Sequence, residues 1–183
     1  MRTNRFRFYA LKICLILFLV FLIQLFFDKF TQLFLLNSYS YLQFWRFFTA
    51  IFLHGNFVHL LYNVFALVLF GSMLERLIGS RRFLFVFFIT GLLANLVSVN
   101  FYDNSLGASG AIFGIIGALI IVRPLMIVWA FGLPMPIFIA GILWAVGDAI
   151  GIFVPSNVAN LAHLSGMFFG LIFGYLYKKN STH

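Results

Sequence analysis

Residues 107–124 read GASGAIFGIIGALIIVRP, a serine between small residues at the start of an apolar stretch. The stretch from Ser109 to Val122 is long enough for one helix, and Arg123-Pro124 ends it. Burying an unpaired hydroxyl in hydrocarbon costs a few kcal/mol. A serine at this place therefore predicts either a polar partner on a neighbouring helix or a catalytic role for the hydroxyl.

The composition indicates that most of the chain lies in a membrane. Of its 183 residues, 63% are hydrophobic and only 9% are charged, whereas about a quarter of the residues of a soluble domain are charged. We therefore expect an all-α, polytopic membrane protein, because a chain in lipid must satisfy its backbone hydrogen bonds internally. The length is suited to one integral membrane domain over residues 1–183 with short terminal tails.

Six apolar stretches predict a bundle of six transmembrane helices. They cover about residues 10–27, 57–78, 83–101, 109–122, 136–152 and 161–177. Pro134 and Pro136 mark the entry to the fifth helix, since proline is tolerated in a first helical turn. The fourth helix is short: at 1.5 Å per residue it spans about 21 Å of a hydrocarbon core roughly 30 Å thick.

Two connections are longer than turns. The segment from 28 to 56 alternates aromatic and polar residues, which favours a structure in the membrane interface, with Trp45 and Arg46 as anchors. Residues 125–133 form the second connection. The sequence shows no internal repeat of the kind that marks a transporter, and no low-complexity tail.

The basic residues predict the orientation of the bundle. With both termini cytoplasmic, ten of the twelve Lys and Arg residues lie inside and only Lys29 and Arg46 lie outside. The ten are Arg2, Arg5, Arg7, Lys12, Arg76, Arg81, Arg82, Arg123, Lys178 and Lys179. Because they lie at helix ends and not on one continuous face, the net charge of +8 does not indicate a nucleic-acid partner. This orientation places the start of the fourth helix in the external half.

A single cysteine, Cys14, excludes an intramolecular disulfide and a metal site built from several thiolates. We expect neither a metal nor a cofactor. The basic start and the apolar run that follows it resemble a signal peptide. However, residues 13–27 lack a small-residue cleavage site, so we expect the first helix to be retained.

Glycine spacing predicts which helices touch. Small residues let helix backbones approach closely in a membrane, and they recur on the fourth and sixth helices: Gly110, Gly114 and Gly117 on one, Gly166, Gly170 and Gly174 on the other. His163 is three residues before Gly166 and shares its face. We therefore expect the side chains of His163 and Ser109 to meet.

Such a pair has a chemical use. A serine hydroxyl becomes a good nucleophile when a neutral imidazole accepts its proton. Considered alone, Ser109 is interpreted as a helix-packing or N-cap residue, and His163 as an interhelical hydrogen-bond donor. Together they predict a dyad of nucleophile and general base. None of the acidic residues, Asp28, Glu75, Asp103 and Asp148, is at an obvious helical step from the histidine, so we predict no third member, assign Asp148 no role and expect Glu75 to be structural.

Acyl transfer also needs donors for the developing oxyanion. His59 and Asn63 are four residues apart and share one face of the second helix. We predict that they and the backbone N–H of Ser109 serve as these donors, with an interhelical hydrogen-bond role for His59 and Asn63 as the alternative.

In these motifs the chain resembles the rhomboid intramembrane serine proteases of the minimal six-helix, prokaryotic type. The family's Gly-x-Ser-Gly matches Gly107 to Gly110, and its Ala-His with spaced glycines matches Ala162, His163, Gly166 and Gly170. Further matches are His54, His59 and Asn63 on the second helix, Trp45-Arg46 in the first loop, and Gly71, Glu75 and Gly79. The resemblance covers about residues 41–174, and the domain core would be about 41–177. Phe113 stands where many rhomboids have a tyrosine stacked on the histidine.

The resemblance implies an intramembrane serine endopeptidase without cofactor, in a prokaryotic cell membrane, with its active site open to the external side. Its partners would be membrane lipid and single-pass transmembrane substrates with helix-weakening sequences and small residues at the cut. It also implies that the fifth helix, with Trp144, moves to admit substrate laterally. The alternatives are a non-catalytic relative that binds transmembrane helices, and a channel or transporter, for which the spans hold too few ionisable residues.

Overall fold

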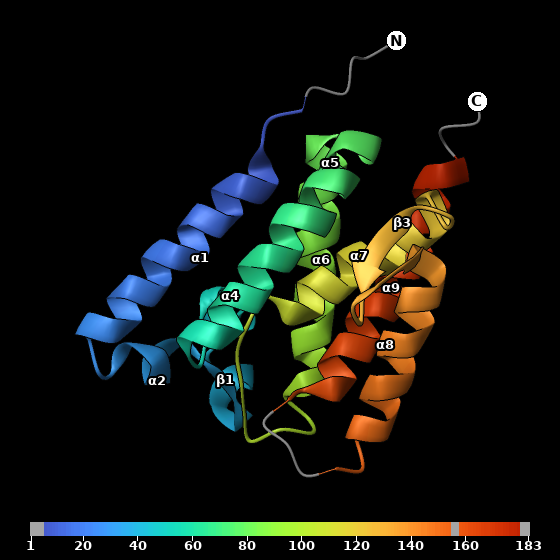
Figure 1. The fold of residues 1–183 in the computed structure, drawn as a ribbon. Coiled ribbons are helices and arrows are strands. Elements are labelled where there is room, and N and C mark those ends of the chain that lie inside the picture. Colours follow the sequence, from blue (N-terminus) through green and yellow to red (C-terminus); the bar gives the residue numbers. More distant parts are fainter. Residues whose placement is uncertain (1–5, 155–157, 180–183) are drawn as a thin grey trace.

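The computed structural model describes residues 6–154 and 158–179 and shows a bundle of membrane helices (Figure 1). Arg2, Arg5 and residues 155–157 lie outside the described residues. Three of the described helical segments are long and apolar enough to cross a membrane, namely Tyr9–Phe26, Phe57–Ile78 and Ser80–Ser98. With the shorter apolar helices beside them, they confirm the predicted helical membrane bundle.

The helices follow the predicted stretches closely. Helix α1 covers Tyr9–Phe26, and the second stretch is helical throughout as α4 (Phe57–Ala66), a π-helical turn η3 (Leu67–Gly71) and α5 (Ser72–Ile78). The remaining long helices are α6 (Ser80–Ser98), α7 (Ser109–Val122), α8 (Ile137–Gly151) and α9 (Asn160–Lys179). The described start of α1 and end of α9 lie at the same end of the bundle (Figure 1).

Helices α7 and α9 pack with their backbones almost in contact. A Cβ added to Gly166 would collide with the carbonyl group of Gly110, and one added to Gly170 would collide with that of Gly114. The glycine rows therefore bring these helices together as predicted, because any larger side chain would separate them. Around them the core is aliphatic and aromatic, with Phe83, Phe87, Leu17, Leu67, Leu74, Ile115 and Leu119 all fully buried.

The connection from 28 to 56 folds into short elements. They are α2 (Phe30–Phe34), β1 (Leu36–Asn37), the 3-10 turn η1 (Ser38–Tyr41), α3 (Trp45–Thr49) and the 3-10 turn η2 (Ala50–Phe52). Strand β1 pairs antiparallel with β2 (Asn104–Ser105). The expectation that Arg46 is a surface anchor is wrong. Its side chain is only 7% exposed, and Nη1 donates to the carbonyl oxygens of Gln32 and Leu35, both at 2.8 Å.

The second connection is a β-hairpin, which the sequence reasoning missed. Strands β3 (Ile127–Ala130) and β4 (Leu133–Pro136) pair antiparallel, with Ala130 opposite Leu133. The two residues between them, Phe131 and Gly132, have positive φ angles of 55° and 77°, the pattern of a type I′ hairpin turn. Both prolines lie in β4, and only Pro136 borders α8, as its N-cap. The hairpin lies beside α8, toward the end of the bundle that holds the described termini (Figure 1).

Candidate active site

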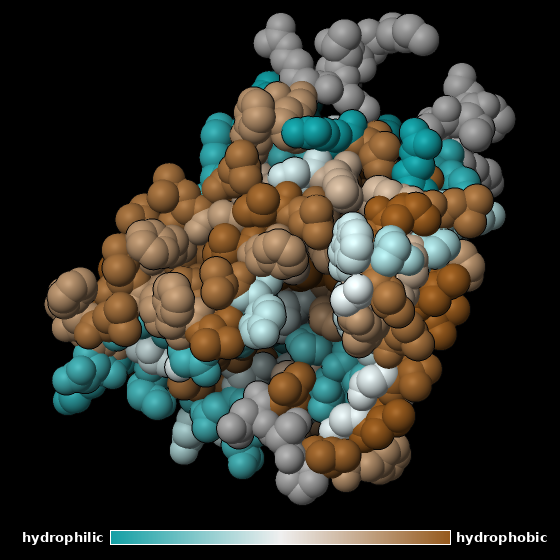
Figure 2. Space-filling model, viewed as in Figure 1, coloured by the Kyte–Doolittle hydropathy of each residue, from teal (hydrophilic) through white to brown (hydrophobic). Residues whose placement is uncertain are grey.

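A large cavity opens between α4 and α8. Its volume is about 1330 Å³, and it is lined by α4, the loop from Phe101 to Gly107, the starts of α7 and α9, Trp144 of α8 and the hairpin residues Trp129 to Phe131. Figure 2 shows a hollow on this face, with hydrophilic residues inside it and hydrophobic surface on both sides. Ser109, His163, His59 and Asn63, the four predicted site residues, all line this cavity.

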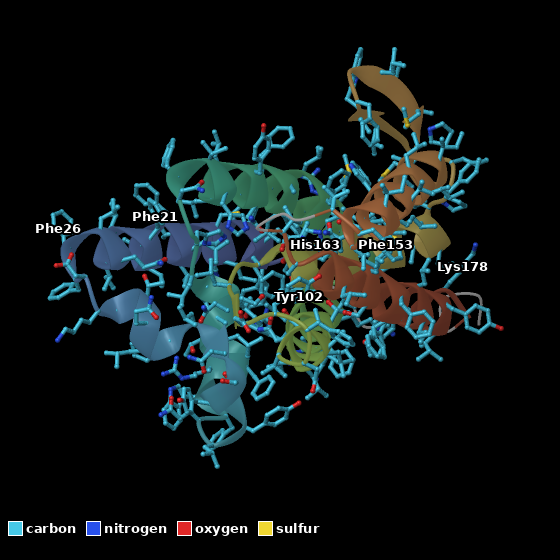
Figure 3. The ribbon with its side chains drawn as sticks, turned by 90° about the horizontal axis from the view of Figure 1, so that it is seen from below. Phe21, Phe26, Tyr102, Phe153, His163 and Lys178 are labelled. Atoms are coloured by element: carbon cyan, nitrogen blue, oxygen red, sulfur yellow. The ribbon has the colours of Figure 1, made fainter. Side chains whose placement is uncertain are left out.

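Ser109 and His163 are in hydrogen-bond contact, with 2.8 Å between the serine Oγ and the imidazole Nε2. Ser109 is the first residue of α7, and Gly107, two residues earlier, has a φ of +123°. His163 lies in the first turn of α9, where the hydroxyl of Tyr102 accepts a hydrogen bond from the Leu161 N–H at 3.1 Å. Figure 3 shows His163 near the middle of the bundle and Lys178 at the far end of the same helix. The close glycine packing below brings the two side chains within reach.

The second ring nitrogen of His163 contacts a carboxylate. Nδ1 lies 3.0 Å from Oδ1 of Asp148, in the last turns of α8. The side chains of His163 and Asp148 are 13% and 10% exposed. Sequence reasoning missed this partner because the sequence of α8 does not show which of its residues face α9. One signal was available: an acidic residue inside an apolar span is by itself a candidate functional group.

His59 and Asn63 lie on the α4 wall of the cavity. Asn56 begins α4 and its side chain accepts a hydrogen bond from the His59 N–H at 2.8 Å. The Asn63 Nδ2 donates to the His59 carbonyl at 2.8 Å. A Cβ on Gly107 would lie 2.7 Å from the His59 ring, so the imidazole rests directly on the backbone that leads into Ser109.

The amides at the start of α7 and the Asn63 side chain, one of whose Nδ2 hydrogens is donated to the His59 carbonyl, border the same cavity. Helix α7 has no side-chain cap at Ala108, so the amides of its first turn are available to an anion. Asn63 is only 4% exposed. The arrangement can place backbone and side-chain donors around an oxygen bound beside Ser109.

His54 supports this wall from behind. It is 2% exposed, and its backbone exchanges hydrogen bonds with the side chain of Gln24 on α1. Its ring meets the His59 ring edge to face at 5.1 Å between centroids. Burial lowers the pKa of His54 to about 3, and His59 acts in the same direction. His54 therefore stays neutral and positions its neighbour by contact.

Comparison with known proteins places the chain in a family. The family model described as the Rhomboid domain matches residues 41–180. Rhomboid protease GlpG of Haemophilus influenzae is 31% identical over 142 residues, which cover 74% of this chain and 70% of the relative. RHOMBOID-like protein 7 of Arabidopsis thaliana is 32% identical over 136 residues, and Rhomboid protease GluP of Bacillus subtilis is 35% identical over 132.

These matches differ in how much of each relative they include. The match to the Arabidopsis protein covers 73% of this chain but only 43% of that protein. The match to GluP covers 70% of this chain but only 25% of GluP. The shared part contains both helices that carry Ser109 and His163. From this match, from the glycine-packed pair α7 and α9 and from the apolar helices around them, we conclude that the chain is an integral membrane protein of the rhomboid family.

Proposed function

We propose that this protein is an intramembrane serine endopeptidase that cleaves transmembrane segments of other membrane proteins. The observation that carries the proposal is the 2.8 Å contact between the Ser109 hydroxyl and His163 Nε2, at the wall of a cavity open between two helices. Relatives named rhomboid proteases support a protease as the class of enzyme. The substrates proposed are single-pass transmembrane proteins.

In the proposed reaction, Oγ of Ser109 attacks the scissile carbonyl carbon while Nε2 of His163 takes the hydroxyl proton. The carbonyl oxygen becomes an oxyanion, held by the Ser109 N–H and by the side chains of His59 and Asn63. His163 then gives its proton to the leaving amine, and the peptide bond breaks to leave an acyl ester on Ser109. A water molecule, deprotonated by His163, hydrolyses this ester and restores the serine.

The proposed orientation follows from the charges. Arg76, Arg81, Arg82 and Arg123 lie at the helix ends that share the side of the described start of α1, which we propose is cytoplasmic. The start of α7 is at the other end of a helix only 14 residues long. Ser109 would then lie about 10 Å below the external surface of a core roughly 30 Å thick, where water can reach it.

The decisive experiment uses purified protein in detergent with a single-pass test substrate. The parent should release two fragments, and Ser109→Ala and His163→Ala should release none above background. A serine-reactive fluorophosphonate should label the parent and not Ser109→Ala, with the mass of one adduct. If all three proteins behave alike, the protein is not a serine protease. Retained substrate binding without cleavage by the parent would identify a non-catalytic helix-binding relative.

A further inference from the structure

Among the described residues, the His163 ring makes two polar side-chain contacts, and the proposed reaction uses only the one with Ser109. The other is the hydrogen bond between Nδ1 and Oδ1 of Asp148. We propose that Asp148 is a positioning residue, which holds the His163 imidazole in the tautomer and orientation that let Nε2 accept the Ser109 proton. This inference rests on the proposed function and adds a residue from a third helix to it.

The geometry of the imidazole decides where its proton lies. A carboxylate can only accept a hydrogen bond, so the Nδ1 that faces Asp148 at 3.0 Å must carry the N–H. In a neutral ring, Nε2 then has a lone pair, and this lone pair faces the hydroxyl of Ser109 at 2.8 Å. Asp148 thus selects the one neutral tautomer that can act as a base toward the serine.

The placement of Asp148 is costly, which argues against a purely passive role. It is 8% exposed on an otherwise apolar helix, IFIAGILWAVGDAIG. Within the described residues, Oδ2 has no hydrogen-bond partner, so the carboxylate is compensated on one oxygen only. A buried ion pair is often no better for stability than well-packed apolar residues. The cost is explained if the carboxylate acts on His163.

The other three acidic side chains that the structure describes lie elsewhere. Glu75 accepts hydrogen bonds from the first turn of α1, and Asp28 is exposed in the turn after α1. Asp103 is exposed in the loop that lines the cavity. Among the carboxylates that the structure describes, Asp148 is the one in contact with the His163 ring.

The helix that carries Asp148 also borders the cavity opening. Toward the hairpin, α8 buries Ile137, Ala140 and Gly141, whereas in its second half Asp148 is the buried residue. Trp144, one turn earlier, lines the cavity and lies 5.9 Å from the Phe70 ring across it. The contact between Asp148 and His163 is thus made in the arrangement that the structure shows, with α8 packed against α9.

The kinetic test is Asp148→Asn. The amide keeps the size of the side chain but can donate to Nδ1, which favours the wrong tautomer. We expect kcat to fall by at least about 100-fold with KM within about twofold, because the corresponding change in a serine-protease triad lowers kcat by roughly 10⁴. Asp28→Asn, which removes an exposed carboxylate far from the cavity, is the matched control and should keep parental kcat.

A second measurement separates positioning from folding. With nitrogen-15 labelled histidine, the parent should show His163 as the Nδ1–H tautomer, and Asp148→Asn should shift it toward Nε2–H. The thermal unfolding midpoint of Asp148→Asn should equal or exceed that of the parent, since a buried charge is removed. Parental kcat, or an unchanged tautomer, in Asp148→Asn would overturn the inference while leaving the proposed function intact. A parent that cleaves no better than Ser109→Ala would instead overturn the function, and the tautomer would still test the contact.

Discussion

The ring of Phe113 lies flat on the imidazole of His163, with 4.3 Å between centroids and 7° between planes. Phe113 is one turn after Ser109 on α7, so the helix that supplies the hydroxyl also supports the face of its partner. The stack needs an aromatic ring and no hydroxyl. A phenylalanine is therefore sufficient for this stack.

Replacing the stacked ring should slow the reaction modestly. We expect Phe113→Leu to lower kcat about two- to tenfold, corresponding to the ~0.5–1.5 kcal/mol that an aromatic pair contributes. Phe113→Tyr should stay within about twofold of the parent. The measurement is kcat on the single-pass substrate, with circular dichroism to check folding. Equal losses in both variants would show that the stack is not what matters.

Glu75 stabilises the start of α1 from a neighbouring helix. Phe8, the N-cap of α1, gives no side-chain hydrogen bond, but the Glu75 carboxylate accepts from the N–H groups of Tyr9 and Ala10, both at 3.0 Å, and also from Ser80. We expect Glu75→Gln to lower stability by about 1.5–3 kcal/mol, since an amide loses one charged acceptor. Thermal unfolding in detergent measures this, with Asp28→Asn as the control. An unchanged midpoint would contradict the capping role.

The contact between α7 and α9 can be tested with two glycines. Gly170→Ala should destabilise the protein by about 1–3 kcal/mol, because its Cβ would meet the Gly114 backbone, which cannot move aside easily. Gly147→Ala on α8 meets nothing within 4 Å, and should raise stability by roughly 0.5–1 kcal/mol through helix propensity. The thermal unfolding midpoints of the two variants test whether close packing at Gly170 stabilises the protein. The same shift in both would rule out a packing role.

Restricting α8 should block large substrates only. In a Cys14→Ala background, Phe70→Cys and Trp144→Cys can be joined by a short bifunctional thiol-reactive reagent such as a bis-methanethiosulfonate, since the centroids of the parental rings are 5.9 Å apart. We expect the crosslinked protein to lose cleavage of the transmembrane substrate and to keep its reaction with the small fluorophosphonate. Reducible crosslinks should restore cleavage on reduction. If crosslinking leaves cleavage unaffected, α8 is not the entrance.

The helices were predictable because lipid imposes a simple pattern on them. Apolar length gave their bounds within a few residues, and the glycine rows predicted which two pack most tightly. The pairing of α7 with α9 then brought Ser109 close to His163. Each of these inferences used residues within one helix, or a match between two small-residue rows.

The features that were missed depend on contacts between distant segments. Asp148 reaches His163 only because of how α8 leans on α9, which no local pattern encodes. Arg46 is buried because its guanidinium donates hydrogen bonds to carbonyl groups of the preceding segment. The β3–β4 hairpin was hidden because its strands are four residues each, and because two prolines suggested a helix start.

Those prolines have a consequence for the outer edge of the hairpin. The N–H of Ile137 bonds to the Met126 carbonyl at 2.8 Å, so every second residue before it, Met135 and Leu133, turns its N–H toward β3. The alternate positions facing outward are Pro134 and Pro136, which have no N–H. The free edge of β4 therefore offers no N–H donor at these two positions, which disfavours pairing with a foreign strand along this edge.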